Sequence, residues 1–203
     1  HSLSALEVAE NLEAGILQVL PDDTITKIPL ADGGEGTVQS LIDATGGKRV
    51  HVTASDPLMR KINSFFGILG DNKTAVIEMA AASGIELLKP EERDPWITTT
   101  FGTGELIKDA LDRGVKKILL GIGGSATNDG GAGMAQALGV GFMGRFGPID
   151  VQGGGALAEV QEIQMDTLDD RIESTEIIVA CDVDNPLLGE HGAASVFGPQ
   201  KGA

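Results

Sequence analysis

The first twenty residues show the hydrophobic pattern of an amphipathic helix. Apolar residues recur every three or four positions from Leu6 to Leu20, and glutamates occupy the opposite side. Ser4 and Glu7 have the spacing of a capping box, in which each side chain satisfies a backbone N–H at the helix start. We therefore expect a helix to open the chain.

Strands and helices are expected to alternate after this helix. A hairpin indicates antiparallel pairing, whereas strand–helix–strand units favour parallel pairing. The turn from Gly70 to Asn72 joins two predicted strands as a hairpin, so the sequence predicts an α/β fold with a mixed sheet. The predicted strands are 24–29, a segment around Val50 and Val52, 62–69, 74–78, 117–122, 140–142 and 176–181, and the predicted helices end at Gly46 and cover 105–113.

Composition and charge limit the classes of partner. The 203 residues are 41% hydrophobic, which is enough for a core, and the formal net charge is −15. Such an excess of acid disfavours binding to nucleic acid and to an anionic membrane surface. No apolar run approaches the ~20 residues of a transmembrane helix, and Cys181 has no second cysteine to pair with. We expect a cytoplasmic protein whose partner is a small molecule.

The most informative segment runs from Leu119 to Gly131, where a predicted strand enters a loop of glycines, hydroxyls and one carboxylate. Glycine lets backbone N–H groups approach a ligand, and a helix after the loop would direct its positive end to the same place. The loop is predicted to bind phosphate, and the alternative is a tight turn without a ligand. The residues predicted to contact a nucleotide cofactor are Gly123, Gly124, Ser125, Thr127, Asn128 and Gly130.

Carboxylates at predicted strand ends are candidates for proton transfer and metal binding. Asp129 is a candidate catalytic base or Mg²⁺ ligand, with an Asx turn or a helix N-cap as the alternative. Asp182 and Asp184 follow a predicted strand and suit a divalent cation, although a solvated loop would have the same composition. Asp182 is also a candidate catalytic residue.

The glycine-rich loop at residues 31–36 supplies a second group of candidates. Its acidic residues suit a substrate or a metal, and helix capping is the alternative. A threonine at the start of the helix predicted near residue 105 offers a further hydroxyl, although threonine is also common in strands and at N-caps. The residues predicted to bind substrate are Asp32, Gly33, Gly34, Glu35 and Thr103.

Five segments carry a resemblance to a known family. They are Ala31-Asp32-Gly33-Gly34-Glu35-Gly36-Thr37, residues 77–84, residues 121–133, Ala180-Cys181-Asp182-Val183 and residues 197–203. Together they resemble the bacterial glycerate kinases of the first type, over essentially the whole chain. The resemblance implies ATP-dependent phosphorylation of D-glycerate to 2-phosphoglycerate, with Lys201 as a catalytic charge partner for a phosphate or for the glycerate carboxylate. Phosphoryl transfer of this kind uses a metal, so Mg²⁺ is expected.

The resemblance also implies a domain organisation. The chain is similar to the N-terminal half of these kinases without their first strand, and in that family a flavodoxin-like domain is interrupted by an inserted α/β domain that resembles the restriction-endonuclease fold. The pattern of predicted elements changes near residues 53–57. We therefore expect residues 1–55 to be part of the flavodoxin-like outer domain and residues 56–203 to form the inserted domain. An alternative is that the last residues of the chain belong to the outer domain again.

Two other functions remain open. Gly121, Gly123 and Ala126 match the local G-x-G-x-x-G/A pattern of dinucleotide-binding loops, which would suit an NADP-binding oxidoreductase. The acidic residue expected about 20 residues later is missing, and Arg145 there suits at most a 2′-phosphate. A non-catalytic binding fragment is the third interpretation. A homo-oligomer is compatible with each of them.

Overall fold

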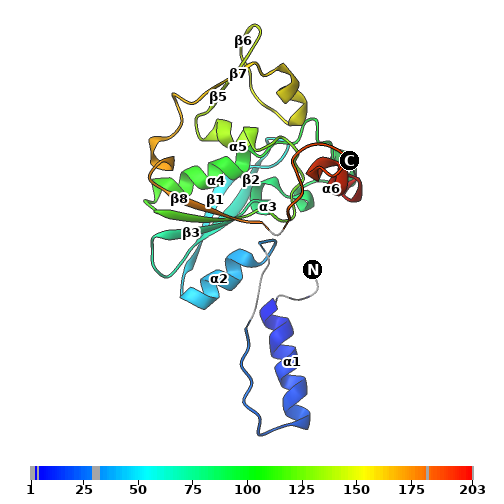
Figure 1. Ribbon diagram of the computed structural model, residues 1–203. Helices are drawn as coiled ribbons and strands as arrows, with labels where there is room; N and C mark the ends of the chain where they lie inside the picture. Colours follow the sequence, from blue (N-terminus) through cyan, green and yellow to red (C-terminus); the bar gives the residue numbers. More distant parts are fainter. Residues whose placement is uncertain (1–2, 4, 29–32, 182, 203) are drawn as a thin grey trace.

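A five-stranded mixed sheet forms the centre of the protein, as the computed structural model of residues 3, 5–28, 33–181 and 183–202 shows (Figure 1). The strand order is β1-β2-β3-β4-β8, with antiparallel pairing from β1 to β3 and parallel pairing from β3 to β8. The predicted α/β fold with a mixed sheet is confirmed at this level. The strands are β1 (Lys48–Ser55), β2 (Lys61–Ile68), β3 (Thr74–Glu78), β4 (Lys117–Gly121) and β8 (Glu176–Ala180).

Helices cover both faces of this sheet (Figure 1). On one face Val38 and Ile42 of α2 pack against Val76, whereas on the other Leu106 of α4 packs in a larger core with Ile77. Val76 and Ile77 are neighbours on β3 and point to opposite faces, as the strand period of two requires. The helices are α1 (Ala5–Val19), α2 (Thr37–Thr45), α3 (Ala80–Ser83), α4 (Phe101–Asp112), α5 (Ala132–Ala137) and α6 (Ala193–Lys201).

A second, smaller sheet lies beyond α5 at the top of Figure 1. It consists of β5 (Gly141–Gly144) between β6 (Gly147–Pro148) and β7 (Glu162–Gln164), and all of its pairs are antiparallel. Phe142 and Val140 form a small core with Ala132 of α5. Four short 3₁₀ turns complete the described elements, at Ile85–Leu87, Pro90–Glu92, Gly154–Glu159 and Asp170–Ile172.

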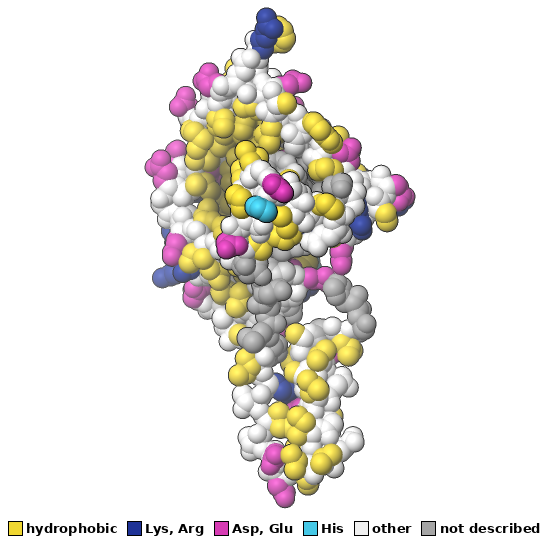
Figure 2. Space-filling model, turned by 45° about the vertical axis from the view of Figure 1, so that its right-hand side comes forward, with side chains coloured by type: hydrophobic (Ala, Val, Ile, Leu, Met, Phe, Trp, Pro, Cys, Tyr) yellow, Lys and Arg dark blue, Asp and Glu magenta, His cyan; other side chains and the backbone are white. Residues whose placement is uncertain are grey.

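The first helix stands apart from both sheets. None of the residues of α1 is buried, and its apolar side chains, such as Leu12 and Ile16, lie largely exposed. Figure 2 shows these hydrophobic side chains gathered at the bottom of the view. An ion pair between Lys27 and Glu13 ties the following segment to the helix. Within the described residues, no helix combines the length and apolar character needed to cross a membrane.

A strand edge with apolar side chains is also open. Every residue of β8 is exposed, including Ile177, Ile178 and Val179, and β4 is the one neighbour that the sheet order gives this strand. A strand at the edge of a sheet leaves one row of backbone N–H and C=O groups without sheet partners. Among the described residues, the sheet therefore ends in an exposed strand with apolar side chains.

Two predicted boundaries differ from the structure. Residues 24–28, the described part of the predicted strand 24–29, are not a strand, because no neighbouring strand within the described residues supplies the ladder of hydrogen bonds. Helix α4 begins at Phe101, four residues before the predicted start, and Asp129 accepts the backbone N–H of Thr100 at this end. The division at residues 55/56 falls between β1 and β2 of one sheet, and it stays a prediction.

Candidate functional site

The two glycine-rich loops meet at the carboxyl ends of the parallel strands. The register places Glu78 of β3, Gly121 of β4 and Ala180 of β8 side by side at this edge. Gly33 lies over the edge, where the backbone N–H of Gly123 donates to its carbonyl oxygen at 3.3 Å. Open α/β sheets place ligands at this edge of the sheet. The sequence-predicted loops thus share the position where a site is expected.

The loop after β4 is held by the segment that follows α3. The N–H of Ile85 donates to the carbonyl of Gly124 and the N–H of Ala126 donates to that of Ser83, both at 2.9 Å. Gly124 has a φ of +71°, a conformation that side chains other than glycine rarely adopt. These contacts turn Ser125 toward one side of the loop and leave Gly124 on the other. The loop therefore separates two cavities that share Ile85.

The larger cavity, of about 370 Å³, contains two basic side chains, and we call it the cationic cavity. Its walls are residues 93–95, residues 125–128 and helix α6. Arg93 and Lys201 supply the positive charges, and Asp94 supplies one carboxylate, which accepts the N–H of Trp96 at 2.9 Å. The volume is within the range of small-molecule sites.

Lys201 joins the end of α6 to the glycine-rich loop. Its Nζ donates to the carbonyl oxygen and to the hydroxyl Oγ of Ser125, both at 2.8 Å. Burial lowers the pKa of Lys201 below that of an exposed lysine. An ammonium group has three N–H donors, so one remains for a ligand in the cavity.

Arg93 lines the same cavity and contains a buried donor without a partner in the described part of the chain. Its Nε is buried and has no hydrogen-bond partner among the described residues. No ion pair of Arg93 occurs in that part of the chain. A buried donor without an acceptor costs free energy unless a ligand or water satisfies it. The sequence analysis missed Arg93, whose available signal was its position in a short acidic segment between Pro90 and Pro95.

Asp129 organises the start of two helices. Its side chain is 1% exposed and accepts hydrogen bonds from five donors. The backbone N–H groups of Gly131 and Gly133 come from the start of α5, and the N–H and hydroxyl of Thr100 come from the start of α4. The N–H groups at the start of α5 are therefore directed to Asp129, and phosphate binding by the loop at residues 123–130 stays a prediction. This geometry matches the capping alternative, and a catalytic role stays a prediction.

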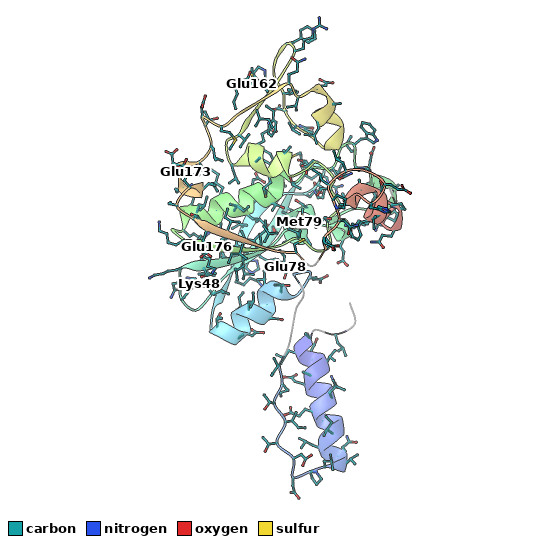
Figure 3. All side chains as sticks on the ribbon, viewed as in Figure 1. Lys48, Glu78, Met79, Glu162, Glu173 and Glu176 are labelled. Atoms are coloured by element: carbon teal, nitrogen blue, oxygen red, sulfur yellow. The ribbon has the colours of Figure 1, made fainter. Side chains whose placement is uncertain are left out.

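The smaller cavity, of about 230 Å³, lies on the other side of the loop and is lined by Glu35, Glu78 and Gly124. Glu78 is buried at the end of β3, and Figure 3 shows it beside α2, where one carboxylate oxygen accepts the N–H of Val38 at 2.7 Å. Burial raises the pKa of Glu78, and the charge of Glu35 acts in the same direction. The sequence analysis gave Glu78 no role, although a carboxylate ending a fully buried strand is a usable signal.

Replacing Glu78 with glutamine is expected to stabilise the protein near neutral pH. Because the pKa of Glu78 is raised on folding, the folded chain binds this proton more strongly than the unfolded chain. Its contribution to stability is therefore complete below the ordinary glutamate pKa and is lost as the pH rises through the folded value. Glutamine keeps an acceptor for Val38 without a charge. Urea unfolding from pH 4 to 8 should show a flatter profile for Glu78→Gln, whereas the exposed control Glu173→Gln should follow the parent, and parallel profiles would contradict the expectation.

The other sequence-predicted residues occupy different places. Ser125, Thr127 and Asn128 line the cationic cavity with Lys201. Thr103 is buried and shares a hydrogen bond of 2.7 Å with Ser83, apart from both cavities. Asp184 and Gly130 are exposed, whereas Asp32 and Asp182 lie outside the described residues. The binding roles predicted for Gly33, Gly34 and Gly123, at the junction of the two loops, stay predictions, like those of the others.

Metal binding finds no support in the described residues. In the ranges 5–28, 33–181 and 183–202, no group of three or more His, Cys, Asp and Glu side chains is placed to hold a metal ion. Mg²⁺ prefers several oxygen ligands, and Asp184 alone does not provide them.

Two glycine-rich loops at the ends of parallel strands, beside a cavity with two basic side chains, define an α/β protein with a candidate site for an oxyanion. The sequence profile of the glycerate kinase family matches residues 1–203. The chain therefore belongs to the glycerate kinase family.

Individual relatives agree with this assignment. The chain is 58% identical to a glycerate kinase of Haemophilus influenzae and 54% identical to a glycerate 2-kinase of Escherichia coli K12, in each case over 100% of the chain and 54% or 53% of the relative. A crystal structure from Salmonella typhimurium LT2, provisionally assigned as glycerate kinase 2, superposes with a TM-score of 0.90 at 55% identity, covering 100% of the chain and 55% of that protein. The chain spans about half the length of these relatives. The oxidoreductase interpretation receives no support from them.

Proposed function

We propose that the chain takes part in the ATP-dependent phosphorylation of D-glycerate to 2-phosphoglycerate. The observation that carries the proposal is the cationic cavity under the glycine-rich loop of a glycerate kinase family member. Phosphoryl transfer depends on donors and positive charges that position anionic groups. The loop and the cavity supply hydroxyl, amide and ammonium groups for this purpose.

Each part of the site has a proposed task. Ser125, Thr127 and Asn128 offer neutral donors to a phosphate, and Lys201 offers a charge. Asp182 and Asp184 are the residues proposed to hold Mg²⁺, which would supply positive charge beside a phosphate. Asp182 is also the better candidate for accepting the proton of the attacking hydroxyl, because the carboxylate of Asp129 is occupied by five donors.

A finer description of the fold belongs to this proposal. We propose that residues 1–55 are part of a flavodoxin-like domain and residues 56–203 form an inserted domain resembling the restriction-endonuclease fold. The exposed apolar side of α1 and its position apart from the central sheet support the assignment of this helix to another domain. A cytoplasmic location and assembly as a homo-oligomer are further expectations for the whole protein.

An ADP-release assay with ATP, Mg²⁺ and D-glycerate tests the proposed activity. We expect little turnover by the 203-residue chain and clear turnover by a chimera in which the chain replaces the matching half of the Haemophilus influenzae glycerate kinase, because the chain matches about half of that relative. The same assay without D-glycerate measures unspecific ATP hydrolysis. A folded chimera without D-glycerate-dependent ADP release would contradict the proposal, and binding of NADPH instead would favour the oxidoreductase.

A further inference from the structure

Two basic side chains without carboxylate partners face the cationic cavity. Lys201 bonds only to the neutral oxygens of Ser125 in the contacts of the described residues, and Arg93 has no ion pair there. Asp94, at the wall of the same cavity, bonds to the backbone of Trp96. Two basic side chains without an ion pair among the described residues therefore lie at one cavity.

The buried Nε of Arg93 strengthens the case for a ligand. A guanidinium group presents its N–H donors in a planar fork that matches the two oxygens of a carboxylate or phosphate group. Here the donor on Nε is removed from water and has no acceptor in the described protein. Because Arg93 lines the cavity, an oxyanion bound there would supply the opposite charge that its guanidinium lacks among the described residues. No other side-chain nitrogen or oxygen of the described residues is buried without a partner.

We propose that Arg93 and Lys201 together bind the oxyanion group of a substrate, with Arg93 as a substrate-binding residue that the loop motifs do not reveal. This inference deepens the proposed function and rests on it for the identity of the ligand. The oxyanion is either the carboxylate of D-glycerate or a phosphate of the nucleotide. Lys201 belongs to α6 and Arg93 follows the turn Pro90–Glu92, and both line the cavity together with Ser125 and Asn128.

Steady-state kinetics of Arg93 variants in the chimera distinguish the two sources. Arg93→Met is expected to raise one KM by about tenfold: that of D-glycerate if the carboxylate is bound, or that of ATP if a phosphate is bound. Arg93→Lys keeps the charge and loses the fork, so it should recover part of the affinity. Arg145→Met is the matched control, because Arg145 is an exposed arginine of a distant hairpin that contacts the Phe146 ring. Thermal unfolding of each variant checks that the protein remains folded.

A binding experiment tests the inference without turnover. Isothermal titration calorimetry of the chain and the chimera with inorganic phosphate and with D-glycerate should show millimolar binding of at least one anion. Arg93→Met and Lys201→Met should each weaken it about tenfold, and Arg145→Met should leave it unchanged.

The outcomes separate the inference from the proposed function. An inactive chimera that binds an anion in an Arg93-dependent way would overturn the kinase proposal and keep the anion site. An active chimera in which folded Arg93 variants keep both KM values within twofold of the parent would overturn the anion site and keep the kinase. If Arg93→Met fails to fold, the KM and binding values of Arg93→Lys decide in the same way. Absence of anion binding in every folded protein would also overturn the inference.

Discussion

Replacing Asp129 with asparagine is expected to lower the free energy of unfolding by about 3 kcal/mol. The carboxylate is buried, and one of its oxygens accepts from Thr99, Thr100 and Gly133, while the other accepts from Gly131. The asparagine side chain replaces one of these two acceptor oxygens with an NH₂ group, which is itself a donor. The donors that bonded to that oxygen then have no acceptor. Donors that lose their acceptor in a dry site cost more than the hydrogen bonds themselves contribute. Urea unfolding of the chain measures the loss.

The exposed Asp166→Asn is the matched control and should leave the unfolding free energy within about 0.5 kcal/mol of the parent. Turnover of the chimera distinguishes positioning from proton transfer. If Asp129 holds the ends of α4 and α5, both stability and kcat fall. A stable Asp129→Asn protein with a greatly reduced kcat and unchanged nucleotide affinity would instead identify Asp129 as the base. An unchanged stability and kcat would remove it from both roles.

Replacing Gly121 with alanine is expected to lower kcat/KM of the chimera by about 100-fold, as a displacement of about 1 Å in a site can do. A Cβ at Gly121 would lie within 2.3 Å of the carbonyl oxygen of Gly33 and 3.0 Å of its carbonyl carbon. Since these are backbone atoms, the contact can be relieved only by moving one loop away from the other. The movement would carry Gly123 and the start of the proposed phosphate loop with it.

Gly15→Ala is the control for this substitution. Gly15 lies in the exposed helix α1, and nothing lies within 4 Å of an added Cβ. Alanine there should raise helix stability by up to about 1 kcal/mol and leave kcat/KM unchanged. The comparison requires steady-state kinetics and thermal unfolding of both variants. A Gly121→Ala protein with parental kinetics would show that the junction of the loops does not position the site.

Local patterns predicted the central sheet because its strands are short apolar runs between clear turns. Residues 74–78 and 117–122 were predicted almost to the residue, since burial on both faces leaves a continuous hydrophobic sequence. The small sheet was mostly missed, because β6 has two residues and every residue of β7 is exposed. Helix α6 was missed for a similar reason: its sequence, which contains Pro199, shows little amphipathic pattern.

The sequence predicted the loop residues of the candidate site. It did not predict the residues from distant parts of the chain that lie beside them. Ser125, Thr127 and Asn128 could be found because glycines and hydroxyls after a strand form a local signal. That Arg93 faces the same cavity depends on how residues 90–95 fold back over the loop, and no spacing in the sequence records it. The same is true of Asp129. Three of the hydrogen bonds that its carboxylate accepts come from Thr99 and Thr100, about 30 positions earlier in the sequence.

Because the edge strand β8 is exposed and apolar, the tendency of this chain to self-associate is expected to depend on its net charge. Ile177, Ile178 and Val179 together with a free row of backbone groups form a template on which another copy could add a strand. A net charge of −15 keeps two copies apart at low ionic strength. Salt shortens this repulsion to about 10 Å at 0.1 M. We therefore expect the net negative charge to oppose association through the exposed strand, and to do so most strongly in dilute buffer.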